Sequence, residues 1–93
     1  MKAEDRVRIL KAIGTGRRWM EELISARTPS TDAIASRECL SERSVRMTVS
    51  LAQLAPSIVR AIIDGRLPRG IAVRNLAELP SSWAEQEQML GIT

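Results

Sequence analysis

The sequence predicts an all-α fold of five to six helices, and its composition is the first observation behind that prediction. Of its 93 residues 44% are hydrophobic, while Phe and Tyr are absent and Trp occurs only twice. The aromatic residues that favour strands are therefore scarce, and the dominant Ala, Leu, Ile, Arg and Glu suit helices packed through aliphatic side chains. A chain of this length supports one modest core, so we expect a single domain over residues 1–93.

Hydrophobic spacing also predicts helices, most clearly in residues 1–27. An apolar stripe at helical spacing is formed there by Val7, Leu10, Ile13, Trp19, Met20, Leu23 and Ile24. It predicts a helix over residues 4–27, which Pro29 ends because the residue before a proline leaves the α region. Gly14 and Gly16 lie inside this helix, and each costs about 1 kcal/mol relative to Ala. We therefore expect a kink or a break at residues 14–16.

Helix-capping residues divide residues 30–54 into two helices joined by a tight turn. Ser30 or Thr31 caps the first helix, over residues 32–38, and Ser41 caps the second, over residues 42–54. The turn between them is Cys39-Leu40-Ser41. The positions expected to face inward are Ile34, Ala35, Val45, Val49, Leu51 and Ala52.

Residues 55–93 are predicted to add the C-terminal helices. The first begins at Pro56, ends near Gly65 and has an apolar face of Ile58, Val59, Ile62 and Ile63. A basic loop over residues 66–70 leads to a short helix over residues 72–79. The sequence Ser82-Trp83-Ala84-Glu85 has the form of a capping box and opens a last helix that ends near Gly91. We expect Trp83 to lie in the core and to hold this helix in place.

Charge and cysteine content exclude several classes of protein. Cys39 is the only cysteine and histidine is absent, which excludes an internal disulfide, a cysteine-based zinc site and the usual general base. We therefore expect no cofactor, no metal and no enzymatic activity. No apolar run approaches the roughly 18 residues that span a membrane and no signal peptide opens the chain, so a cytoplasmic location is expected.

The basic residues are almost all arginines, and the net charge is +3. Of the fourteen basic side chains only Lys2 and Lys11 are lysines. The planar fork of donors on Arg suits phosphates and guanine edges, although a GC-rich coding sequence explains the same bias equally well. Four arginines surround the basic loop with only Asp64 nearby, namely Arg60, Arg66, Arg69 and Arg74.

The pattern of residues 30–54 is typical of a helix-turn-helix, whose second helix enters the major groove of DNA. Leu40 occupies the position of an apolar plug in the turn, and Val45 that of the buried anchor. Two positions depart from the pattern: Cys39 stands where Gly is favoured, and Thr48 where an aliphatic residue is expected. In this register the exposed edge of the second helix carries Ser41, Glu42, Arg43, Arg46, Met47 and Ser50.

These exposed residues have the chemistry of a DNA contact. Arg43 and Arg46 suit guanine O6 and N7 or phosphates, and the hydroxyls of Ser41 and Ser50 suit phosphates. Glu42 accepts a hydrogen bond from cytosine N4 or complements the helix dipole. Arg66 and Arg69 are expected to add contacts to the DNA backbone. The alternative is a solvated helix face of alternating charge.

Residues 30–92 contain a series of short segments in a fixed order, namely Ala35-Ser36-Arg37-Glu38, Leu40-Ser41-Glu42-Arg43-Ser44-Val45, Leu54-Ala55-Pro56, Ile58-Val59, Ala61-Ile62, Asp64-Gly65-Arg66, Ser82-Trp83-Ala84-Glu85-Gln86 and Leu90-Gly91. Through these segments, which span most of the chain, the sequence resembles the C-terminal region of large serine site-specific recombinases of bacteria and their phages. Arg17-Arg18-Trp19 with Glu21-Glu22-Leu23 is similar to the helix that precedes the motif. More weakly, the helix-turn-helix is similar to partition proteins of the ParB and KorB kind.

This resemblance implies a DNA-recognition module, and not recombination, because nothing in the 93 residues corresponds to the catalytic serine domain or the zinc-binding cysteines. The implied partner is double-stranded DNA, with a homodimer or a larger recombinase-type partner as further possibilities. The sequence departs from the family at Cys39, at Ser44 where an aromatic is usual, at Thr48 where Leu is usual and at Gln53 where Phe is usual. A helical protein-interaction module using the acidic residues Glu78, Glu85 and Glu87, or a degenerate remnant, therefore stays open.

Overall fold

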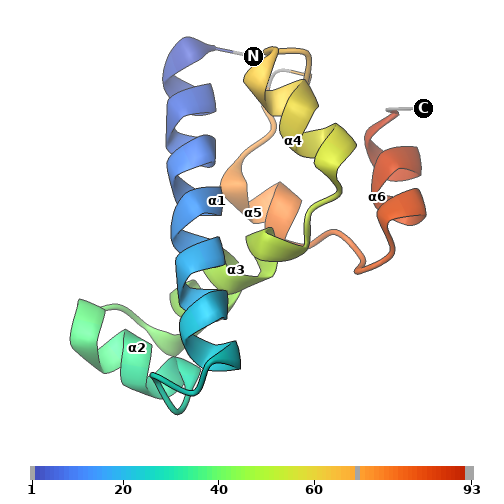
Figure 1. Cartoon of the computed structure of the whole chain (residues 1–93). Helices are drawn as coiled ribbons and strands as arrows, with labels where there is room; N and C mark the ends of the chain where they lie inside the picture. The colour runs from blue at the N-terminus through green and yellow to red at the C-terminus, as the bar shows by residue number, and fades with distance from the viewer. Residues whose placement is uncertain (1, 69, 92–93) are drawn as a thin grey trace.

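One long helix, α1 (Ala3–Ile24), forms the axis against which most of the shorter helices pack (Figure 1). The computed structural model describes residues 2–68 and 70–91, and it confirms an all-α fold with no strand in that part of the chain. The remaining elements are α2 (Thr31–Glu38), α3 (Glu42–Ser50), the 3-10 turn η1 (Leu51–Gln53), α4 (Pro56–Ile63), α5 (Val73–Ala77) and α6 (Trp83–Leu90). No helix in these residues is both long enough and apolar enough to cross a lipid bilayer.

Helix α1 continues through residues 14–16, so a break there is a wrong prediction. Gly16 is buried where α1 crosses α3, and a Cβ atom on it would collide with the carbonyl oxygen of Thr48 and lie 3.1 Å from the carbonyl carbon. The glycine therefore allows the two helices to approach at their backbones. Gly14 faces open space, with nothing within 4 Å of an added Cβ.

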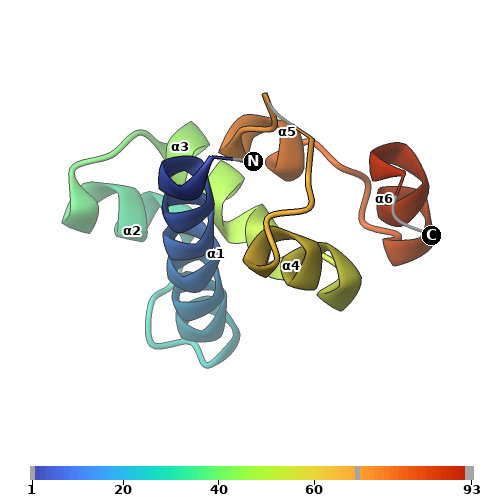
Figure 2. The ribbon, with the colours of Figure 1, turned by 90° about the horizontal axis from the view of Figure 1, so that it is seen from above.

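Two hydrophobic clusters lie along α1. The first joins the N-terminal half of α1 to η1, α4 and the segments that follow, through Ile9, Ile13, Leu51, Leu54, Ile58, Ile62, Leu67 and Leu76. The second joins the C-terminal half of α1 to α2 and α3, through Trp19, Ile34, Ala35, Val45 and Val49. Figure 2 shows α2 and α4 on opposite sides of α1, in keeping with these two clusters. Val7, Ile24 and Ile63, which belong to the predicted apolar stripes, are exposed.

The predicted caps explain where the helices begin and end. Ser30, Ser41 and Ser82 each accept a hydrogen bond from the backbone N–H three residues on, at 3.2, 3.1 and 3.4 Å. Pro56 is the first residue of α4, and Gly91 ends α6 in the left-handed conformation (φ 69°). The helix predicted over residues 42–54 instead ends at Ser50 and tightens into η1, and α5 is shorter than predicted.

Helix α6 lies at the edge of the molecule, next to α4 (Figures 1 and 2). The side chain that fixes α6 is Gln86, which is 2% exposed. The prediction that Trp83 holds this helix from within the core is wrong. The Gln86 amide accepts from Ala55 N at 2.8 Å and donates to Gln53 O at 3.1 Å and to Pro80 O at 2.8 Å. Trp83 is 54% exposed and only its Nε1 reaches inward, donating to Gln53 O at 3.1 Å. The indole of Trp83 thus lies on the surface, and the hydrogen bond from its Nε1 attaches it to the backbone at Gln53.

Candidate nucleic-acid interface

Helices α2 and α3 form the predicted two-helix unit, and α1 holds it from behind. Val45 and Val49 of α3 pack against Trp19 of α1 and Ile34 of α2, and the exposed fractions of Val45 and Ile34 are zero. Burying one side of α3 in this way leaves its other side at the surface. The buried set agrees with the inward positions predicted for Ile34, Ala35, Val45 and Val49.

The turn has the backbone predicted for a helix-turn-helix. Cys39 adopts the left-handed conformation (φ 57°), and the N–H of Leu40 donates to Ala35 O at 3.0 Å. A residue with a Cβ atom is strained in this conformation by roughly 1–2 kcal/mol, so the missing Gly costs stability here. Leu40 is 48% exposed, so its predicted role as a buried plug is wrong. Trp19 from α1 fills the space beneath the two helices instead.

The N-terminal half of α3 carries most of the predicted contact residues at the surface. Arg43 is exposed, and the side chain of Arg46 is 64% exposed. The carboxylate of Glu42 pairs with Arg46 Nε at 3.3 Å and accepts from the hydroxyl of Thr31 at 3.4 Å. Ser41 is exposed as well, but its hydroxyl oxygen already caps α3 and donates to Ser44 Oγ at 3.0 Å.

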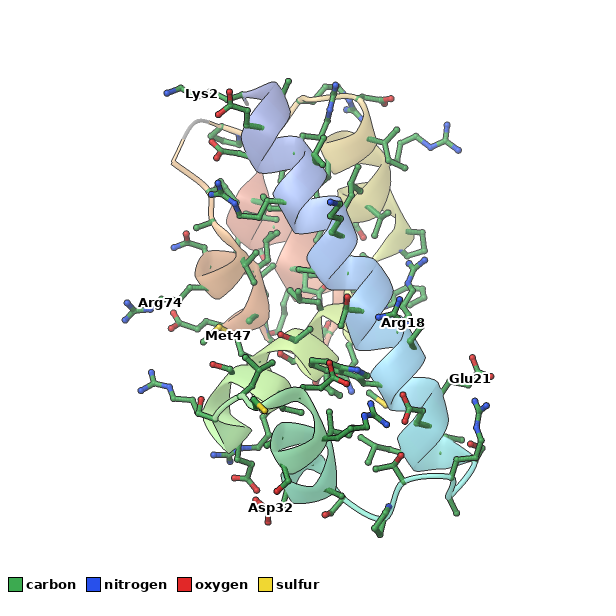
Figure 3. All side chains as sticks on the ribbon, turned by 90° about the vertical axis from the view of Figure 1, so that its left-hand side faces the viewer. Lys2, Arg18, Glu21, Asp32, Met47 and Arg74 are labelled. Atoms are coloured by element: carbon green, nitrogen blue, oxygen red, sulfur yellow. The ribbon has the colours of Figure 1, made fainter. Side chains whose placement is uncertain are left out.

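The C-terminal half of α3 is less open than predicted, because α5 packs beside it. Ser50 is half-buried, and its hydroxyl donates to Met47 O at 2.7 Å and lies 3.5 Å from Ala77 O of α5. Ser50 therefore does not lie on the exposed edge. Met47 is also half-buried, and Figure 3 shows it on the same side of the molecule as Arg74 of α5.

The basic loop lies away from α3. Arg66 pairs with Asp64 at 3.4 Å, and the nearby Ile63 carbonyl accepts from Arg6 Nη1 at 3.4 Å, at the N-terminal end of α1. Gly16, which contacts α3, is ten residues further along α1, or roughly 15 Å at 1.5 Å per residue. The expected cluster around this loop does not form one patch on α3: Arg74 lies on α5, which packs beside α3, and Arg66 pairs with Asp64 in the loop. Arg69 lies outside the described residues.

A second polar cluster ties α2 to the end of α1, and the separate patterns of the two helices did not predict it. Arg37 of α2 donates to Glu22 of α1 at 2.6 Å and to Glu38 at 3.0 Å. The hydroxyl of Thr28 donates to the same Glu22 carboxylate at 2.8 Å. The Arg37 hydrogen bond, followed by that of Thr28, lowers the pKa of Glu22 from 4.5 to about 2. The hydrogen bond to Glu22, followed by that to Glu38, raises the pKa of the Arg37 guanidinium above its ordinary value.

We expect this cluster to make the stability of the chain sensitive to acid. The folded-state pKa of Glu22 is depressed, so its stabilisation is complete above about pH 4.5 and is lost as pH falls towards about 2. Urea unfolding of the wild type and of Glu22→Gln, each from pH 6 to pH 2, measures it. The difference in unfolding free energy between the two should narrow as pH falls, because the wild-type carboxylate becomes protonated. A difference that is the same at pH 6 and pH 2 contradicts the assignment.

Comparison with known protein families, with curated protein sequences and with solved structures finds no match for this chain.

Proposed function

We propose that this chain is a DNA-binding helix-turn-helix module that places the N-terminal half of α3 in the major groove. The observation that carries the proposal is the exposed pair Arg43 and Arg46 on a helix whose opposite side is fixed in the core. Arginine is the side chain best suited to bind both phosphates and guanine edges. The fixed side of α3 gives these arginines a defined orientation.

The dimensions of α3 suit a groove. An α-helix with its side chains is about 10–12 Å across, which the major groove, about 12 Å wide, accepts, and the nine residues of α3 run for roughly 13 Å. In the helix-turn-helix arrangement the N-terminal residues of the second helix meet base edges while the first helix crosses the backbone. Ser41, Glu42, Arg43, Arg46 and Met47 then contact the groove. Arg74 of α5 lies beside α3, with its Nε paired to Glu78 at 3.3 Å.

The resemblance of residues 30–92 to the C-terminal region of large serine recombinases supports the same proposal. The resembling segments include Leu40-Ser41-Glu42-Arg43-Ser44-Val45, which spans the turn and the exposed half of α3. We therefore propose that the module is recombinase-related and binds double-stranded DNA without catalysing strand exchange.

Titration with random-sequence duplex DNA at several salt concentrations tests this function. We expect salt-sensitive binding at micromolar protein, and we expect Arg46→Ala to weaken that binding. Arg8→Ala is the matched control, because Arg8 is also an exposed, ion-paired arginine but lies at the N-terminal end of α1. Absence of salt-sensitive binding, or equal losses in the two variants, contradicts the proposal.

A second candidate function, a protein-interaction module, is favoured by one apolar surface. A shallow depression of about 310 Å³ lies where the end of α1 meets η1, with Met20, Ile24 and Ala52 among its lining residues. Ile24 is 77% exposed there. Binding of a partner protein that Ile24→Ser abolishes, without any binding to DNA, would favour this second function.

A further inference from the structure

The Glu42 carboxylate bridges the two helices of the motif and the arginine proposed to contact DNA. One of its oxygens, Oε2, accepts from the hydroxyl of Thr31, the first residue of α2, at 3.4 Å. The other, Oε1, pairs with Arg46 Nε at 3.3 Å, one turn further along α3. Glu42 thus receives a hydrogen bond from α2 and forms an ion pair with Arg46. Its side chain is 37% exposed against 64% for Arg46, so the arginine is the outer member of the pair.

This arrangement restricts how Arg46 can bind a ligand. The two charges meet at Nε as an ion pair, not as a hydrogen bond, and this leaves the terminal nitrogens Nη1 and Nη2 as donors for a ligand. Two parallel donors at fixed spacing match O6 and N7 of guanine in the major groove. An arginine restrained by an ion pair also loses less conformational freedom on binding than a free one.

The charge of Glu42 opposes the other use of Arg46, which is to neutralise a phosphate. The pair is neutral as a whole, and a phosphate beside it would be repelled by the carboxylate. The acceptors of guanine are uncharged and feel that repulsion much less. The pair therefore disfavours contact with the DNA backbone and favours contact with a base.

We infer that Arg46 reads a guanine in the major groove, and that Glu42 and Thr31 are positioning residues that orient Arg46 and reject phosphate. The inference rests on the proposed function and extends it to the feature of DNA that is recognised. The preferred duplexes should share one guanine, and removing the Glu42 charge should raise affinity for DNA in general while lowering discrimination.

Sequence selection from a random duplex library, followed by replacement of single guanines with 7-deazaguanine, tests the base contact. The analogue pairs normally but lacks the N7 acceptor. We expect one guanine whose replacement weakens the wild type by about tenfold and leaves Arg46→Ala unchanged, because the variant no longer makes that contact. Wild-type binding with no guanine of this kind overturns the inference while the proposed function stands. Absence of DNA binding by the wild type fails the proposed function itself.

Variants of Glu42 and Thr31 test whether these two residues position Arg46. Glu42→Gln should bind random duplex more tightly, with a steeper salt dependence, and should prefer the selected duplex over random duplex by a smaller factor. Thr31→Val should shift that factor in the same direction, and Thr31→Ser, which keeps the hydroxyl, should restore it. Glu4→Gln makes the same charge change at the far end of α1 and should leave the factor unchanged. Thermal melts of each variant serve as the control for folding. If Glu42→Gln changes selected and random affinities by equal factors, the positioning role is wrong.

Discussion

Gly16→Ala is expected to lower the free energy of unfolding by at least about 2 kcal/mol. The added Cβ would collide with the carbonyl oxygen of Thr48, which is backbone and cannot rotate away. Overpacking typically costs about 1–3 kcal/mol, and a clash with fixed backbone lies at or above the upper end of that range. A loss of about 2 kcal/mol or more therefore remains after the gain of about 1 kcal/mol from replacing a helical glycine. The measurement is the midpoint of urea unfolding, followed by circular dichroism.

Gly14→Ala is the matched control, two residues earlier on the same helix. Nothing lies within 4 Å of a Cβ at this position, so only the gain in helix propensity should remain, and the variant should be more stable by about 1 kcal/mol. Opposite signs for the two substitutions are the signature of close packing between α1 and α3. Stabilisation by both would mean that the helices do not approach as closely as the structure places them.

Gln86→Met is expected to cost about 3 kcal/mol and to release α6 from the rest of the molecule. The substitution keeps the length of the side chain but removes the acceptor for Ala55 N and the donor for the Gln53 and Pro80 carbonyls. Ala55 is 1% exposed, and an unpaired polar group in such a place costs about 1–3 kcal/mol. Urea unfolding measures the loss, and faster hydrogen exchange of the α6 amides should accompany it.

Gln88→Met is the control for this prediction, because Gln88 lies on the same helix and is exposed. It should change stability by less than about 0.5 kcal/mol, as surface substitutions usually do. If Gln86→Met and Gln88→Met are equally stable, Gln86 does not hold α6. Trp83→Ala should have a smaller effect than Gln86→Met, since Gln86 still donates to Gln53 O when the indole is gone.

The parts of the fold that local chemistry determines were predictable from the sequence. Ser30, Ser41 and Ser82 are followed by helices because each hydroxyl caps the N–H groups of the next turn, a contact made within three residues. The buried face of α3 followed from the spacing of Val45 and Val49. These features need no knowledge of distant segments.

The wrong predictions concern residues whose environment is made by segments far apart in the chain. Local sequence alone made Gly16 look like a helix breaker. Its actual role, which is to allow α3 to approach α1 closely, depends on Thr48, 32 residues further on. Trp83 looked like the anchor of α6 on hydrophobicity alone, whereas a polar side chain, Gln86, finds three backbone partners in a buried place. Nothing near either residue in the sequence indicates these contacts.

In the candidate site, too, features set by local sequence were predictable and features set by distant segments were not. Arg43 and Arg46 lie at the surface, as the helical spacing of α3 predicted, and the left-handed Cys39 was predicted from the turn pattern. The neighbours of α3 were not predictable from its own sequence. Ser50 is covered by α5, which packs back against α3 and whose Ala77 lies 27 residues further along the chain. This packing places Arg74 of α5 beside α3, while Arg66 pairs with Asp64 in the loop.

Amide chemical shifts of the ¹⁵N-labelled chain, recorded as duplex DNA is added, test the central claim most directly. The account predicts that the largest salt-sensitive shifts cluster at residues 41–47, with a smaller group near Arg74. Binding through any other surface would move the cluster. Shifts centred on Arg66 and the N-terminal end of α1, or on the depression at Met20 and Ile24, with residues 41–47 unchanged, would contradict it.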